Sequence, residues 1–164
     1  MAANKRLLQS EREKGTVIVE LAIVTPLLLL ILAGIIDLGM LFWEREVMTN
    51  AAREGARAAS RAKLAGAADK TVAQVRTIVQ TYLRSNNVKN TSGGDITLTT
   101  TNCTYTWDLT KTPIILTVRL IDIPVKMMML PNIQTLFPGS GGVSNEVKLN
   151  ATITMGAEWV TPPS

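Results

Sequence analysis

The chain has 164 residues, which is enough for one membrane segment and one small globular domain. It has no histidine and a single cysteine, Cys103. An intramolecular disulfide, a zinc site of the usual Cys/His kind and a Ser-His-Asp or Cys-His catalytic set are therefore excluded. The net charge of +4 is mild and Lys and Arg are not clustered in runs, so the sequence gives nucleic-acid binding little support.

The amino-terminal third contains a long apolar run. The first residues are polar, and the chain becomes apolar abruptly after Gly15. Between residues 17 and 43 the only charged residues are Glu20 and Asp37. A transmembrane helix needs ~20 mainly apolar residues, so this run is long enough to span a bilayer. It is too long for the apolar core of a secretory signal peptide.

The two acidic residues in this run need an explanation. A charge in hydrocarbon is costly, so an acidic residue there indicates a functional site by default. On the residues alone, Glu20 would reach the interface near the end of an ordinary membrane anchor. Asp37 lies about 100° around the helix from Glu20, so the two do not share a face. We place Asp37 at the outer interface, with pairing to Arg45 or to a neighbouring subunit as the alternatives.

The helical pattern continues beyond the apolar run, and we predict a helical extension over residues 44–63. One face carries small residues at spacings of four, four and three, which would let two helix backbones approach closely. Either this is an Ala-rich helix whose charges simply face water, or it packs against other helices. The small face comprises Ala51, Gly55, Ala59 and Ala62, and a neighbouring basic stripe comprises Arg53, Arg57 and Arg61.

A second helix is predicted from about Ala67 to Ser85. Apolar residues recur in it at spacings of three and four, which is typical of an amphipathic helix. Asp69 is the candidate N-cap. The following stretch, residues 85–95, is dense in Asn, Ser and Gly and is predicted to be a loop.

Three strands are predicted after this loop. Residues 96–107 are rich in Thr and aromatic residues. Residues 112–125 carry apolar residues on both faces, which favours a central strand, and Pro124 should end or bend it. Residues 145–159 alternate with a clear period of two. The predicted fold class is therefore α+β, with a long amino-terminal helix, a second helix and about three antiparallel strands.

Two features of the carboxy-terminal part keep alternative interpretations. Residues 126–142 include the consecutive methionines Met127–Met129 between two prolines. This segment either packs under the sheet or forms a subunit-contact loop, because Met-rich surfaces adapt to different partners. Cys103 is predicted to be an ordinary strand residue, although in an oxidising compartment it could pair between subunits.

The ordered motifs of the amino-terminal third resemble a known family. The polar leader, Gly15, Thr16 and then Glu20 resemble the processing site of type IV prepilins, in which a membrane peptidase cuts directly after the glycine. The segment VELAIVTPLLLLILAGIIDLGMLFWEREVMTNAAREGARAA is similar to the TadE-like proteins. These are minor pilins or pseudopilins of tight-adherence (Flp-type) pilus systems. The resemblance covers roughly residues 14–60.

The resemblance implies a role for Glu20. Cleavage would free the amino group of Thr16, and filament assembly would bury the apolar helix among other helices. An unpaired buried carboxylate is very costly. Glu20 would therefore pair with the terminal amine of a neighbouring subunit, or with its own, and fix the axial register.

The resemblance also implies the topology, which charge leaves undecided because Lys and Arg flank both ends of the apolar run. A cytoplasmic leader is expected over residues 1–15 and an inner-membrane helix over residues 16–43. The helical extension over residues 44–63 would then lead into a periplasmic α+β domain over residues 64–164.

The expected function is structural: initiation, priming or tip formation in a tight-adherence pilus. The implied partners are other pilin or pseudopilin subunits, a prepilin peptidase, the inner-membrane assembly platform and membrane lipid, with no nucleic acid and no cofactor. The alternative is a membrane-anchored periplasmic binding or scaffold module that is never polymerised. An enzyme is not expected, because Asp108, Asp122 and Glu146 do not supply an acid, base and nucleophile set.

Overall fold

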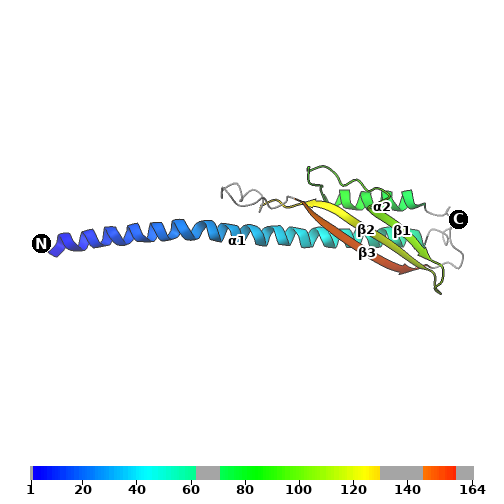
Figure 1. Cartoon of the computed structure of the whole chain (residues 1–164), viewed down its shortest axis with the longest axis horizontal. Helices are drawn as coiled ribbons and strands as arrows, with labels where there is room; N and C mark the ends of the chain where they lie inside the picture. Colours follow the sequence, from blue (N-terminus) through cyan, green and yellow to red (C-terminus); the bar gives the residue numbers. More distant parts are fainter. Residues whose placement is uncertain (1, 62–70, 130–145, 158–164) are drawn as a thin grey trace.

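The computed structural model describes residues 2–61, 71–129 and 146–157, with side chains from residue 15 onward. The chain begins with one long helix, α1 (Ala2–Ser60), which contains Pro26 without a break. Next to this proline, the Thr25 hydroxyl donates a hydrogen bond to the carbonyl oxygen of Leu21 at 2.6 Å. In Figure 1 the first half of α1 extends away from the rest of the molecule, and its second half lies against the sheet and the other helix.

The second helix, α2 (Val72–Ser85), begins about five residues later than predicted. Its N-cap is Thr71, so the prediction of Asp69 was wrong. Thr71 and Gln74 form a capping box, in which each side chain accepts a hydrogen bond from the other residue's backbone nitrogen, at 3.3 Å and 2.9 Å. The amphipathic stripe is present, and the buried residues of α2 are Val75, Val79 and Leu83.

Three antiparallel strands form an open sheet in the order β1-β2-β3, which confirms the predicted fold class. The strands are β1 (Cys103–Asp108), β2 (Ile115–Lys126) and β3 (Glu146–Gly156). The predicted central strand is β2, and the predicted alternating strand is β3.

The first predicted strand was wrong over residues 96–102, which lie outside any strand. The backbone nitrogen of Leu98 donates to the Gln80 side chain at 3.2 Å, and that of Thr99 donates to the Asn102 side chain at 2.7 Å. The alternating pattern of residues 96–99 therefore reflects burial of Ile96 and Leu98 from a loop, not pairing in the sheet.

Pro124 does not end the central strand, because β2 continues for two residues beyond it. The irregularity lies earlier, where the register with β3 shifts between Leu120 and Ile123. Asp122 has a φ of 50° there, and its backbone nitrogen donates to the Asn150 side chain at 2.6 Å. Pro124 is tolerated because β1 pairs with β2 only as far as Leu120, so the later residues of β2 have no strand partner on that side among the described residues.

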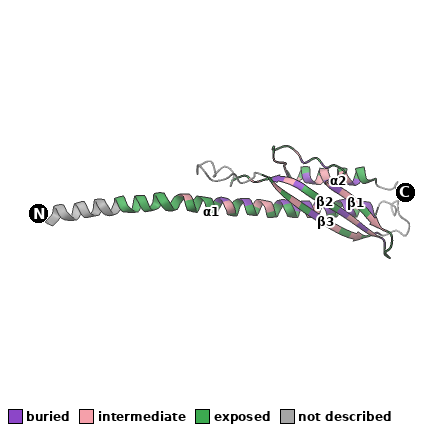
Figure 2. Cartoon of the chain, viewed as in Figure 1, coloured by how far each residue is buried: buried purple, intermediate pink, exposed green. Residues whose placement is uncertain are grey.

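The larger of two hydrophobic clusters among the described residues lies between the sheet, α2 and the second half of α1. Figure 2 shows that buried residues of α1 are concentrated in this second half, whereas the described side chains before it are mostly exposed. The contribution of α1 consists mainly of small and flexible residues, which let the helix lie close to its neighbours. These residues are Val47, Met48, Ala51, Ala52, Ala56 and Ala59.

Candidate functional site

The predicted processing site lies on the first half of α1, in continuous helix. Gly15, Thr16 and Glu20 are all exposed. A Cβ added at Gly15 would meet nothing within 4 Å. Within the part of the chain that the structure describes, this segment is open to an enzyme or to a neighbouring subunit.

The apolar side chains that follow this site are also exposed. From Val17 to Ile36 the large apolar side chains are 37–72% exposed. Among the described residues, α1 is the one helix that is long and apolar enough to cross a membrane. A continuous apolar surface of this size marks contact with lipid or with other protein chains.

The predicted small face is divided between the core and a close helix contact. Ala51, Gly55 and Ala59 are buried, whereas Ala62 lies outside the described residues. At Gly55 an added Cβ would lie 2.6 Å from Cγ2 of Val79 and 3.3 Å from Cγ1 of Val75. The backbone of α1 therefore approaches α2 of the same chain as closely as a glycine permits.

The predicted basic stripe faces away from the core. Arg53, Arg57 and Arg61 are all exposed. The first two line an open groove of about 550 Å³, together with Tyr82 of α2 and residues 153–155 of β3. The structure thus presents two guanidinium groups beside the free edge of the described sheet, where they remain accessible.

Asp37 is covered by the segment that follows β2, a contact within the chain that the sequence did not predict. It is 2% exposed. Its carboxylate accepts hydrogen bonds from the backbone nitrogen of Met128 at 3.0 Å and from that of Met129 at 2.9 and 3.1 Å. Because hydrogen bonds to a charged group are among the stronger ones, Asp37 attaches this segment to α1. The side chains of Met128 and Met129 are 49% and 42% exposed, so these two residues do not pack under the sheet.

Glu44 is a buried acid that the sequence analysis missed. It is 6% exposed, and its Oε2 atom has no hydrogen-bond partner among the described residues. Glu44 lies beyond the apolar run, where α1 packs against the domain, and burial raises its pKa from 4.5 to about 7. The available signal was its position four residues after Met40 and four before Met48, on one helix face.

Cys103 lies at the start of β1 and is 2% exposed. Burial raises the pKa of its thiol, although the neighbouring Arg76 guanidinium partly opposes this shift. A buried, protonated thiol cannot reach a thiol of another subunit, so the structure argues against the intersubunit disulfide that the sequence left open.

The acids Asp108, Asp122 and Glu146 lie on the three strands of the sheet. Asp108 ends β1 and accepts a hydrogen bond from the backbone nitrogen of Thr110 at 3.0 Å. This bond and that from the Thr110 hydroxyl lower its pKa. Asp122 lies in the irregular part of β2. No group of three or more potential metal ligands occurs in residues 2–61, 71–129 and 146–157.

Comparison with known protein families confirms the resemblance. Residues 15–57 match the model of the family described as TadE-like protein. The match covers the exposed apolar run, Asp37, Glu44 and two residues of the small face, Ala51 and Gly55, and it ends before α2. No curated protein and no solved structure matches the chain.

Proposed function

We propose that this chain is a minor pilin or pseudopilin of a tight-adherence pilus, processed after Gly15 and active in initiation, priming or tip formation. One observation carries the proposal: the TadE-like match coincides with a helix whose large apolar side chains are exposed from Val17 to Ile36. A helix with this surface needs lipid before assembly and other helices after it. Both environments are available to a pilin, which leaves the membrane when it joins a filament.

Glu20 would then act after cleavage. Once the apolar run is surrounded by other helices, the Glu20 carboxylate is removed from water and needs a cationic partner. The amino group of Thr16, freed by cleavage, lies about one helical turn away along α1 or is supplied by a neighbouring subunit. The ion pair would set how far each subunit is displaced along the filament axis.

The proposed topology follows the same processing. The leader would face the cytoplasm, α1 would cross the inner membrane, and the domain with α2 and the sheet would lie in the periplasm. The partners would be a prepilin peptidase, the assembly platform and other pilin subunits. The chain would act as a structural protein with no catalytic centre and no cofactor.

The first test is the identity of the amino terminus. Mass spectrometry of the chain purified from membranes of a host with the pilus system should find a terminus at Thr16. A Gly15→Leu variant should retain Met1, because the bulky side chain blocks cleavage after this residue. A wild-type chain that retains Met1 would overturn the proposal and favour the alternative, a membrane-anchored periplasmic module that is not polymerised.

The second test concerns assembly. Glu20→Leu should insert into the membrane and fold normally, but pili should be reduced or absent in cells that carry it. The matched control is Val19→Leu, which alters the neighbouring exposed residue and leaves the carboxylate in place. Normal piliation with Glu20→Leu would contradict the assigned role of this residue.

A further inference from the structure

A pocket of about 310 Å³ lies where the apolar run of α1 meets the folded domain. Three elements line it: one turn of α1, the loop after α2 and the end of β2 with the segment that follows. The lining residues include Met40, Trp43, Glu44, Lys89, Lys126 and Met128. Neither the processing of the chain nor its assembly accounts for this pocket.

The acidic side of the pocket is a buried carboxylate. Glu44 is 6% exposed, and its Oε2 has no hydrogen-bond partner among the described residues. An unpaired buried charge is costly, whereas a ligand group that donates a charged hydrogen bond to it offsets this cost. The pocket therefore favours a ligand with a protonated amine that can reach Glu44.

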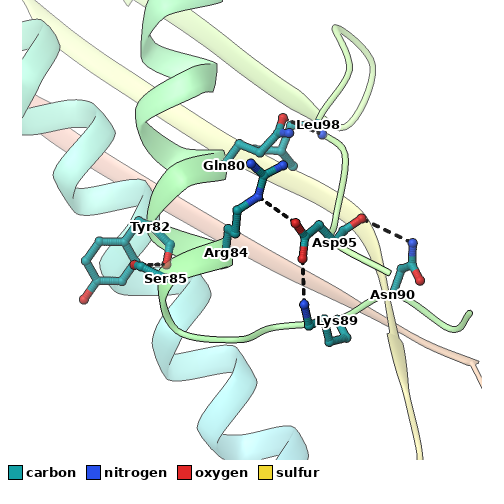
Figure 3. A network of polar contacts seen from close by, with 8 residues as sticks. All are labelled: Gln80, Tyr82, Arg84, Ser85, Lys89, Asn90, Asp95 and Leu98. Carbon is teal, nitrogen blue, oxygen red and sulfur yellow. Dashed lines mark hydrogen bonds and ion pairs between the residues drawn. The ribbon is translucent and has the colours of Figure 1, made fainter. Parts of the chain in front are cut away.

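The opposite charge is supplied by two lysines. Lys89 is held in place by Asp95, whose Oδ1 lies 2.7 Å from the Lys89 Nζ, while Oδ2 of Asp95 lies 2.7 Å from Nε of Arg84 (Figure 3). An ammonium has three donors, so this ion pair leaves Lys89 able to bind another acceptor. Lys126 is the last residue of β2. Together they favour an anionic group, such as a phosphate, in the same pocket.

The third side of the pocket is apolar and adjoins the exposed part of α1. Trp43 is 47% exposed, and Phe42 beside it is 68% exposed. Aromatic residues of this kind are enriched where a membrane helix enters the headgroup region. If the apolar run is inserted in a bilayer, the pocket lies at the height of the lipid headgroups.

We propose that this pocket binds the headgroup of a membrane phospholipid that carries both a primary amine and a phosphate, with the amine on Glu44 and the phosphate on Lys126 and Lys89. Phosphatidylethanolamine has this chemistry. Its acyl chains would follow the exposed apolar side chains of α1 into the bilayer. The inference depends on membrane insertion, which is one part of the proposed function, but not on cleavage or polymerisation.

The same geometry disfavours the other common headgroups. A choline headgroup has no N–H to donate to Glu44, and a glycerol headgroup has no positive charge to compensate the buried carboxylate. Glu44 should therefore decide which lipid binds. Lys126 should affect all phospholipids alike, because each of them carries the phosphate.

The test is native mass spectrometry of the full chain in detergent, with equal amounts of phosphatidylethanolamine, phosphatidylcholine and phosphatidylglycerol of identical acyl chains. At about pH 8 we expect the wild type to retain the amine lipid about tenfold more than either other lipid, which is the ratio expected from one charged hydrogen bond. Glu44→Gln should reduce this ratio to about one. Lys126→Gln should weaken retention of all three lipids by a similar factor.

Matched controls separate the pocket from general effects of charge. Glu46→Gln and Lys148→Gln each change one exposed charge nearby and should leave retention unchanged. Circular dichroism should show the same helix content in every variant. Equal retention of the three lipids by the wild type, or an unchanged preference in Glu44→Gln, would overturn the inference. So would an effect of Glu44→Gln on self-association alone, because Glu44 would then face a cation of another subunit. These failures would leave cleavage after Gly15 and the role of Glu20 untouched.

Discussion

The two halves of α1 share one helical backbone, but their side chains lie in different surroundings. In residues 15–36 the large apolar side chains are exposed, whereas residues 47–59 contribute small residues to the core of the domain. The first half needs large apolar groups because only lipid or other chains can cover it. The second half needs small groups because α2 and the sheet of its own chain already lie against it.

The acidic residues differ in the same way. Glu20 is exposed on the first half of α1, so its carboxylate is accessible to another molecule. Asp37 and Glu44 are buried where the helix meets the domain. Asp37 is occupied by backbone nitrogens of the same chain, and Glu44 faces a pocket. The difference predicts that identical substitutions in the two halves will have different consequences.

The largest effect is expected for Gly55→Val. The added side chain would collide with Val79, which is fully buried and has a stiff, branched side chain. Overpacking of this kind costs about 3 kcal/mol, which exceeds the gain in helix propensity when glycine is replaced by valine. Thermal unfolding followed by circular dichroism should show a loss of well over 10 °C, given about 4–8 °C per kcal/mol for a domain of this size.

The collision at Gly55 can be tested directly with a compensating change. The double variant Gly55→Val with Val79→Ala restores space on α2 and should recover part of the lost stability. The Val79→Ala variant alone should be destabilised by the cavity that it creates. Simple addition of the two single effects would contradict the close approach of the helices.

The next largest effect is expected for Asp37→Ala. This change leaves the backbone nitrogens of Met128 and Met129 without their acceptor, which costs about 2 kcal/mol. Hydrogen exchange should show faster exchange of these two amides, while the core amides of β2 retain their protection. Glu20→Ala is the matched control on the other half of the helix and should leave the exchange pattern unchanged. Unchanged protection of Met129 in Asp37→Ala would contradict the contact.

A smaller effect is expected from the titration of Glu44. Its pKa is raised to about 7 in the folded chain from 4.5, so the folded state binds more protons than the unfolded state between these values. Stability should therefore fall as the pH rises from about 4.5 to 7 and change little above this range. Glu44→Gln removes the dependence: its unfolding temperature in detergent should exceed that of the wild type at about pH 8 and approach it at low pH.

Asp95 provides a control for the pH dependence that Glu44 is expected to produce. The hydrogen bond from Lys89 is the main reason why the pKa of Asp95 lies below its ordinary value of 3.8. The contribution of Asp95 to stability is therefore lost only when the pH falls below this value. An Asp95→Asn variant should therefore keep the dependence between pH 4.5 and 7 that Glu44 produces. A Glu44→Gln variant with the pH profile of the wild type would show that this carboxyl is not responsible.

The sequence was sufficient to predict the features that depend on local pattern. The long apolar helix, the amphipathic stripe of α2 and the alternation of β3 were all recognised from spacing, and the family resemblance followed from the order of motifs. Two local signals were overlooked. Thr71 and Gln74 have the spacing of a capping box, and Glu44 lies four residues after Met40 and four before Met48 on one helix face.

The features that the sequence could not predict depend on contacts between distant parts of the chain. Asp37 bonds to residues more than ninety positions away, and no pattern around it distinguishes a buried acid from an interfacial one. Likewise, the buried residues Ile96 and Leu98 alternate with the exposed residues Thr97 and Thr99, which is the pattern of a strand, but all four lie in a loop. The pocket beside Glu44 depends on three separate elements, so it could be described only once they were placed together.

The smallest effect on stability is expected for Gly34→Val, which repeats the substitution at Gly55 in the other half of α1. A Cβ added at Gly34 would meet nothing within 4 Å. The free energy of unfolding should therefore change by no more than about 0.5 kcal/mol, as for an ordinary surface substitution. Its effect on piliation is then informative, because a folded and inserted variant that fails to assemble would show that another subunit approaches α1 at this glycine. A substantial loss of domain stability would instead mean that the first half of α1 already has a partner within its own chain, and the contrast between the two halves would be wrong.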